Sequence, residues 1–230
     1  MRVENNKQYE MVMNMKKTWL KRTDSYEFFD ARKNGRSLPS WLMQPFSHEN
    51  SRKDNFIIKQ ALSKLISLPF YNHKWYILAS EGTFLIIENV RHVLKNLQTH
   101  LPIYIVIGER QNLTTTTYIL NEKALAVLSQ IKYQKSTVCS NDNFFHLTQC
   151  LEENGVIKYD ISYDSENRKR FFTNERHFSF TEMQDYLKTR NSYWDDAEIF
   201  ESLSPEMLAF YNLRDIEILM FDVFLYRITI

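Results

Sequence analysis

Residues 102–109, PIYIVIGE, are almost continuously apolar. A run of β-branched and aromatic residues without alternating polar positions predicts a strand that is buried on both faces. The next such run, TTTTYIL at 114–120, is predicted to be its hairpin partner. We therefore place the centre of the fold in these two segments.

The residues on either side extend this architecture. Two short strands are predicted at 74–80 (KWYILAS) and 83–88 (TFLIIE), joined in a hairpin by a Glu-Gly turn. Apolar residues at helical spacing predict helices at 90–98 and 121–132. The order strand, strand, helix, strand, strand, helix (ββαββα) predicts an α+β protein with a central mixed sheet built from hairpins.

Both ends of the chain are predicted to be helical. N-terminal helices are expected at 5–31 and 52–67, and further helices are expected to start at Thr181 and Ser204. Residues 207–230 are apolar around most of a helical circumference, so they must be buried in the core or against another chain. A homodimer or a protein partner at the C-terminal helices is therefore one of two open expectations.

Charge is distributed unevenly along the chain. Residues 1–150 carry 20 Lys and Arg against 12 Asp and Glu, whereas residues 151–230 carry 9 against 16. Such a split permits a basic surface for a polyanion, or two segments that neutralise each other on folding. We divide the chain into an α/β core with basic N-terminal helices (1–135) and a helix and hairpin followed by an acidic helical region (136–230). The two parts can also form one continuous domain.

A basic hairpin is predicted after a short helix. The helix at 143–154 ends before Gly155, and two strands, 156–163 and 168–172, follow around a polar DSEN tip. This order resembles the last half of a winged helix, in which a helix reads the major groove and a hairpin contacts phosphates. The alternative is a plain hairpin packed on the sheet with a solvated basic tip. The residues expected to contact nucleic acid are Lys158, Arg168, Lys169 and Arg170, with Lys132 and Lys135 extending the patch.

A possible metal site lies in the same region. Cys139, His146 and Cys150 have the spacing C-x6-H-x3-C, and His177 could supply a fourth ligand for zinc. The same Cys and His could also form a nucleophile pair, although no orienting or oxyanion element accompanies them. The alternative is a buried free cysteine with a hydrogen-bonded histidine. We expect both cysteines to be reduced.

Three carboxylates suggest a different chemistry. Glu88, Asp160 and Asp164 are predicted on or near strand ends. Brought together, they would bind Mg²⁺ through oxygen ligands and support phosphodiester hydrolysis. The alternative is that each is an ordinary solvated acid.

Composition excludes several classes of protein. Four isolated glycines leave no phosphate-cradling loop of the P-loop or dinucleotide type, so no cofactor is expected. Apolar runs are too short for a membrane span, and the first twenty residues are too polar for a secretion signal, so we expect a cytoplasmic protein without membrane contact. Abundant Asn, Lys, Tyr and Phe are typical of an AT-rich coding source such as a mobile genetic element.

The sequence therefore favours a non-catalytic function, namely nucleic-acid binding or regulation through a helix and a basic hairpin. Two alternatives from other classes stay open. One is a protein-binding adaptor or effector that uses the acidic, apolar C-terminal region as its interface. The other is a Mg²⁺-dependent nuclease that uses the three carboxylates.

Overall fold

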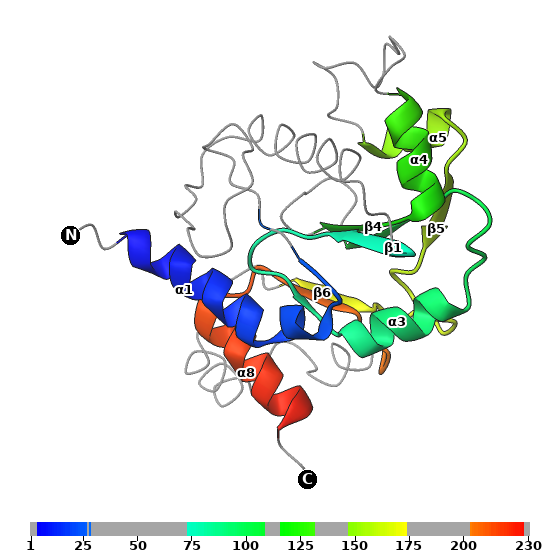
Figure 1. Cartoon of the computed structure of the whole chain (residues 1–230). Coiled ribbons are helices and arrows are strands. Elements are labelled where there is room, and N and C mark those ends of the chain that lie inside the picture. Colours follow the sequence, from blue (N-terminus) through cyan, green and yellow to red (C-terminus); the bar gives the residue numbers. More distant parts are fainter. Residues whose placement is uncertain are drawn as a thin grey trace.

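The computed structural model describes residues 4–26, 28, 73–108, 116–131, 147–173 and 203–227 (Figure 1). Several predictions lie outside these residues: the helix at 52–67, the helix start at Thr181, and the side chains of Lys132, Lys135, Cys139, His146 and His177. The described elements are α1 (Glu4–Lys17), the 3-10 helix η1 (Trp19–Arg22), β1 (Trp75–Leu78), β2 (Phe84–Leu85), α3 (Ile87–Lys95), β3 (Ile103–Gly108), β4 (Thr116–Asn121), α4 (Glu122–Ile131), α5 (Leu147–Glu153), β5 (Ile157–Asp160), β6 (Phe171–Thr173), β7 (Ala209–Tyr211) and α8 (Asp215–Tyr226). The α+β class is confirmed.

The first sheet is built around β3. Its strand order is β1-β4-β3-β5, with β3 antiparallel to β4 and parallel to β5. Every residue of β3 and β4 is buried. The predicted central strand and its antiparallel partner are therefore confirmed.

Alternate residues of β3 enter two different cores. Ile103, Ile105 and Ile107 belong to a core that also takes residues from η1, α3, β2, β7 and α8. Tyr104 and Val106 face the other way, toward α4 and α5. Figure 1 shows α4 and α5 on one side of this sheet and α1, α3 and α8 on the other. A strand with a core on both faces needs apolar residues at every position, which explains its sequence.

Asn121 joins the end of β4 to the start of α4. Its Oδ1 accepts hydrogen bonds from the backbone N–H of Ala124 (2.9 Å) and of Ile103 (3.0 Å), and its Nδ2 donates to the Leu101 carbonyl (2.6 Å). The first of these bonds is a helix N-cap, and the other two fix the start of β3. One buried amide thus sets both the beginning of a helix and the register of a strand pair.

The predicted hairpin between residues 74–80 and 83–88 is wrong. β1 pairs with β4 in the first sheet, whereas β2 pairs with β7 in a second sheet of order β2-β7-β6. The turn between β1 and β2 carries the chain from one sheet to the other. Gly82 in this turn has φ +73°, and its carbonyl accepts the N–H of Leu213 at 2.9 Å. A Cβ at residue 82 would lie 3.0 Å from the Leu213 carbonyl oxygen, so this contact requires glycine.

The predicted hairpin at 156–172 is formed only next to its DSEN tip. β5 adds to the edge of β3, and β6 pairs in parallel with β7. Beside the DSEN tip, the two predicted strands share the antiparallel bridge between Tyr163 and Lys169. Two backbone hydrogen bonds flank it, from Arg170 N–H to the Ser162 carbonyl (2.8 Å) and from Asp164 N–H to the Arg168 carbonyl (2.9 Å). The hairpin extends no further because β5 pairs with the open edge of β3, while Phe171 of β6 is buried in the core between the sheets. The long strand pair expected of a winged helix is therefore reduced to a short hairpin at the tip, because β5 and β6 belong to different sheets.

The chain ends differ from the predicted long helices. The first helix ends at Lys17, and η1 follows it after Thr18, whose backbone angles (φ −109°, ψ −113°) are not helical. At the other end, Ser204 begins a turn rather than a helix, since its Oγ accepts the N–H of Glu206. β7 follows, and Asn212 with φ 57° separates it from α8. Of residues 207–227, the part of this region that the structure describes, 215–226 are helical.

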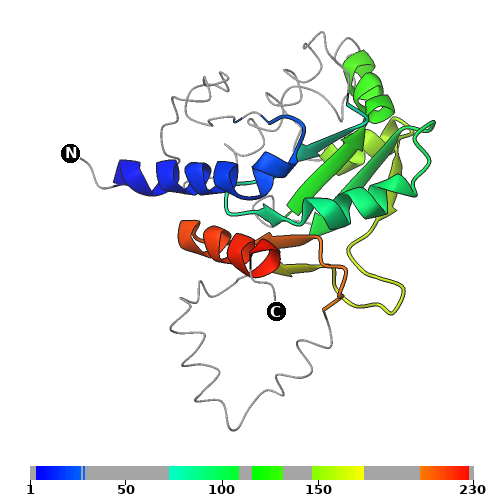
Figure 2. The same cartoon turned by 60° about the horizontal axis from the view of Figure 1, so that its bottom comes forward.

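Both sheets take strands from both sides of residue 135. β5 completes the first sheet, and β2 joins two strands of the C-terminal part in the second sheet. α1 and α8, from opposite ends of the chain, lie side by side (Figure 2). In the part of the chain that the structure describes, no helix has the length and apolarity needed to cross a membrane.

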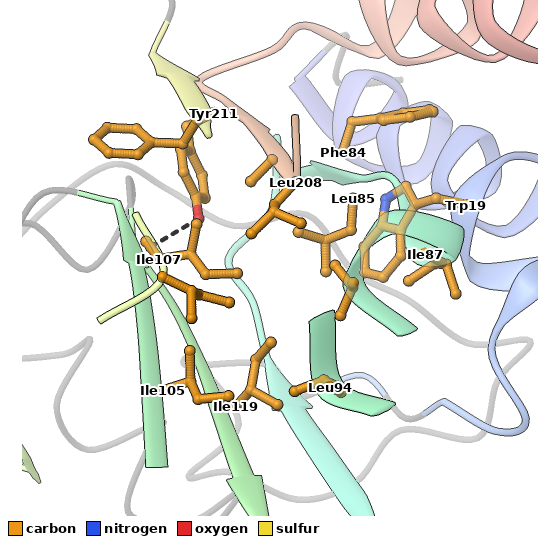
Figure 3. Packing of buried hydrophobic residues seen from close by; sticks show 14 of the residues in the cluster. Trp19, Phe84, Leu85, Ile87, Leu94, Ile105, Ile107, Ile119, Leu208 and Tyr211 are labelled. Atoms are coloured by element: carbon orange, nitrogen blue, oxygen red, sulfur yellow. Dashed lines mark hydrogen bonds between the residues drawn. The ribbon is translucent and has the colours of Figure 1, made fainter. Parts of the chain in front are cut away.

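Tyr211 connects the two sheets in the core. Its hydroxyl donates a hydrogen bond of 2.8 Å to the carbonyl of Ile107, across the interface between β7 and β3 (Figure 3). Burial raises the pKa of this phenol far above its ordinary value, so Tyr211 is a neutral donor at every physiological pH.

We expect Tyr211→Phe to lower the free energy of unfolding by about 1–2 kcal/mol, because the Ile107 carbonyl loses a buried donor. Urea unfolding measures the change. Tyr163→Phe is the matched control, since Tyr163 is 44% exposed, and its effect should stay within about 0.5 kcal/mol. Equal effects of the two variants would contradict this role for Tyr211.

Candidate functional site

The predicted basic residues lie on β5 and on the loop between β5 and β6, and two of them are paired with acids. Arg168 Nε donates to Asp164 Oδ2 at 2.8 Å, and its Nη1 lies 3.1 Å from Glu166. Arg170 Nη2 donates to Glu206 Oε2 at 2.6 Å. The positive charge of both arginines is therefore balanced by neighbouring carboxylates.

Asp164 organises this loop. Its Oδ1 accepts the backbone N–H of Glu166 (2.9 Å) and of Arg168 (2.8 Å). Burial opposes ionisation of Asp164, but the backbone and side chain of Arg168 outweigh it and hold the pKa of the carboxyl well below its usual range. The DSEN tip is thus a turn stabilised by its own acid.

Lys158 and Lys169 have different surroundings. Lys158 is a half-buried residue of the edge strand β5, opposite Tyr104 of β3. Lys169 is exposed, and its backbone forms bridges to Tyr163 and to Leu203. The structure therefore does not combine the four predicted cations into one unpaired basic surface.

The structure does not bring together the three carboxylates of the nuclease alternative. Glu88 lies in the first turn of α3, not in a strand, and accepts a hydrogen bond of 2.5 Å from the Tyr226 hydroxyl. Asp160 accepts the N–H of Ser162, and Asp164 binds Arg168. Among the described residues, no group of three or more His, Cys, Asp or Glu is placed to hold a metal ion.

Cys150 is fully buried in α5 and is disulfide-bonded. The expectation that it is reduced is therefore wrong. A disulfide sulfur has no thiolate to offer to zinc or to a substrate, so Cys150 in this state is neither a metal ligand nor a nucleophile. Cys139 and His146, its partners in the predicted motif, lie outside the described residues.

Sequence reasoning missed an ion cluster between the two ends of the chain. Asp222 of α8 has a side chain only 1% exposed, and its Oδ1 accepts a hydrogen bond of 2.7 Å from Arg22 Nη1. Lys21 and Arg227 approach its other oxygen at 3.6 and 3.1 Å. Burial alone would raise the pKa of Asp222, but Arg22, and behind it Lys21 and Arg227, hold it below its ordinary value.

Arg22 also contacts the aromatic ring of Tyr226 on α8. Its guanidinium lies 3.5 Å from the centroid of the Tyr226 ring, and Tyr226 donates to Glu88, which lies 3.6 Å from Arg22 Nε. Burial and the nearby Glu88 carboxylate raise the pKa of Tyr226. The cluster thus links η1, α3 and α8. Its members are about 200 residues apart in the chain, and no sequence motif marks them.

Several apolar side chains of α8 are exposed. Its residues Glu217, Ile218 and Asp222 are buried against the protein. The apolar residues exposed on the helix are Ile216 (54%), Val223 (39%), Phe224 (53%) and Leu225 (44%). Ile216, Val223 and Phe224 lie within about 100° of one another around the helix axis, whereas Leu225 lies about 180° from Ile216. We call Ile216, Val223 and Phe224 the α8 apolar surface. The apolar composition of residues 207–230 signalled this surface, although only the structure shows which side chains are exposed.

The chain is distantly similar to a protein of Caenorhabditis elegans. The chain is 22% identical over 223 residues to the uncharacterized protein F37A4.3 of Caenorhabditis elegans, which covers 95% of this chain and 75% of that protein. No protein-family model matches the chain. The function must therefore be argued from the geometry.

We expect Asp222→Asn to lower the free energy of unfolding by about 3 kcal/mol, because Arg22 loses its buried counter-charge. The folded-state pKa of Asp222 is below its unfolded value, so its stabilising effect is present above about pH 4 and is lost as the pH falls through the folded value. Urea unfolding at pH 7 and near pH 3 measures this. A difference between wild type and variant that is equally large at both pH values would contradict the assignment.

Proposed function

We propose that the protein binds another protein through the α8 apolar surface. The observation that supports the proposal is the exposure of these three large apolar side chains on one short helix of 12 residues. Exposed apolar groups that cluster on a protein usually mark an interaction site, because each would be more stable out of water.

The arrangement of the surface suits a partner that lies along the helix. Ile216, Val223 and Arg227 are spaced by seven and four residues, so they lie on one side of α8 and its last turn. An apolar stripe that ends in a cation fits the mode in which a helix is bound in a groove.

The charges around this stripe indicate the chemistry of the partner. Lys21, Arg22 and Arg227 share the carboxylate of Asp222, and Arg22 also lies 3.6 Å from Glu88. Lys21 and Arg227 have side chains 44% and 58% exposed. We therefore propose a partner with an apolar groove bordered by carboxylates near the C-terminal end of α8.

A stable homodimer through this helix alone is less well supported. A homodimer needs a surface that is complementary to itself, whereas three cations face only Asp222 and Glu88 in the ion pairs at the C-terminal end of α8. A second copy is therefore an outcome that the experiment must be able to reveal, not the proposal.

The three other functional predictions stay proposals with less support. Nucleic-acid binding would use Lys158 and Lys169, since Arg168 and Arg170 already have acidic partners. Regulation through such binding depends on the same residues. The nuclease alternative needs three carboxylates that have separate partners.

Photo-crosslinking tests the proposed interface. A benzophenone amino acid replaces Ile216 or Val223 in the full chain, which is expressed in its own cells, and crosslinked peptides are identified by mass spectrometry. We expect the same partner from both positions, with crosslinks to apolar residues near Asp or Glu. Position 157 is the control, because Ile157 is 41% exposed but lies on β5.

Purified components then measure the contribution of the surface. Ile216→Glu and Val223→Glu should each weaken binding of the crosslinked partner by about 30-fold, since each removes roughly 2 kcal/mol of apolar burial. Ile157→Glu should leave the affinity unchanged. The proposal fails if position 157 gives the same crosslinks, if both positions crosslink only to a second copy, or if the three Glu variants bind equally well.

Fluorescence anisotropy with labelled single-stranded and double-stranded DNA separates this proposal from nucleic-acid binding. We expect no submicromolar affinity at 50 mM salt, because the loop arginines are neutralised by acids. Binding that weakens steeply between 50 and 200 mM salt, and that Lys158→Gln with Lys169→Gln abolishes, would instead support the nucleic-acid function.

A further inference from the structure

We infer that two copies of the protein form a homodimer by antiparallel pairing of their β5 strands about a twofold axis. In the described part of the chain, β5 is an edge strand of the first sheet, whose order is β1-β4-β3-β5. The observation behind the inference is that residues 157–161, IKYDI, are complementary to themselves about Tyr159. This inference does not depend on the proposed interface at α8.

Backbone hydrogen-bonding groups of β5 are directed to both of its edges. Ile157 N–H donates to the Pro102 carbonyl at 2.9 Å, and the parallel pairing of β5 with β3 continues to Asp160. Since the backbone groups of successive residues alternate between the two edges of a strand, the N–H and C=O of Lys158 and Asp160 are directed away from β3. Among the described residues, the outward backbone groups of Lys158 have no hydrogen-bond partner. Such an edge is a template for pairing with another chain.

The charges on β5 select one register for this pairing. In an antiparallel pair, outward-directed residues of one strand lie opposite outward-directed residues of the other. A twofold axis at Lys158 or at Asp160 would place like charges opposite each other, whereas an axis at Tyr159 pairs Lys158 of each copy with Asp160 of the other. Opposite charges on directly opposed residues stabilise a strand pair, and like charges destabilise it. The register about Tyr159 is therefore favoured.

The pairing of Lys158 with Asp160 also explains how a charged edge can associate. A lysine on an edge strand ordinarily discourages pairing with another chain, but in this dimer each lysine faces a carboxylate of the second copy. Asp160 is exposed. A carboxylate accepts up to about four hydrogen bonds, so Asp160 can bind a lysine and keep the Ser162 N–H (3.0 Å) together with its other contacts.

The apolar residues of the same segment lie on the other face of β5. Ile157 and Tyr159 lie beside isoleucines of β3, on the side of the core between the two sheets. Ile157 is 41% exposed. In the dimer it would lie opposite Ile161 of the second copy, and the two Tyr159 rings would meet at the axis. Aromatic and β-branched residues in such opposed positions stabilise a strand pair.

The length of the paired segment indicates a weak dimer. Beyond Ile161, the Ser162 carbonyl already accepts the Arg170 N–H (2.8 Å), so the hairpin at the DSEN tip occupies the same edge. A strand pair confined to residues 157–161 buries less surface than a standard interface. We therefore expect an association that depends on protein concentration.

Sedimentation equilibrium of the purified full chain tests the dimer. We expect the weight-average mass to rise from one chain toward two between about 1 and 100 μM protein, the range of a weak interface. Lys158→Glu should raise the dissociation constant by about 10-fold or more, because two opposed pairs change from opposite to like charges. Lys169→Glu is the matched control, since Lys169 is exposed but lies outside β5, and it should leave the constant unchanged. A single chain at every concentration, or equal effects of the two variants, would overturn the inference.

A mixture of two charge variants tests the register. Lys158→Glu and Asp160→Lys each place like charges opposite each other in a homodimer. When the two variants are mixed, every opposed pair again joins a cation and an acid, so we expect heterodimers at concentrations where each variant alone is monomeric. A general loss of stability could not produce this rescue. Monomers in a mixture of two variants that are folded by circular dichroism would contradict the register.

Photo-crosslinking decides the question if Asp160→Lys does not fold. A benzophenone amino acid at position 157 of the full chain should crosslink to a second copy near Ile161, independently of what positions 216 and 223 capture. No crosslink to a second copy, or a crosslink to a different part of its surface, would show that the β5 strands do not pair in this way.

Discussion

β3 has an apolar core on each of its faces, and this double burial is the constraint on which the other described elements depend. Its isoleucines need a cover that α3, η1 and the second sheet supply, and Tyr104 and Val106 need the cover of α4 and α5. Each fully buried side chain of this size contributes roughly 2 kcal/mol. The second sheet, formed by β2, β7 and β6, packs against the isoleucine side of β3. Tyr211 of β7 joins the two sheets by a buried hydrogen bond to the Ile107 carbonyl.

The orientation of α8 follows from charge as much as from apolar packing. A helix with nine apolar residues out of twelve could bury several of its faces, yet the buried face is the one that contains Asp222. The ion pair between this carboxylate and Arg22, together with the Arg22 and Tyr226 contact, selects that face. Ile216 and Val223 are consequently left in water.

In the loop between β5 and β6, nearby acids form ion pairs with arginines that the sequence analysis expected to contact phosphate. Three cations within RKR suggest a phosphate-binding tip. Asp164 and Glu166 precede them by a few residues, and Glu206 approaches from the start of the segment that leads to β7. This neutralisation takes place inside residues 151–230, whereas Lys21 and Arg22 with Asp222 are ion pairs between the basic and the acidic segment.

The sequence by itself determined the elements whose signals are local. The continuous apolar run of β3, its antiparallel partner β4, the helical spacing of α3 and α4, and the turn at Gly155 could all be predicted, since each depends on residues close together in the chain. Tertiary structure alone decided which strands pair with β1, β2 and β6, which face of α8 is exposed, that Arg22 meets Asp222, and that Cys150 is oxidised. A short apolar strand has the same sequence pattern in either sheet, and an ion pair between residues 200 apart leaves no periodic signal in the sequence. These pairings are therefore decided only when all elements compete for the same core.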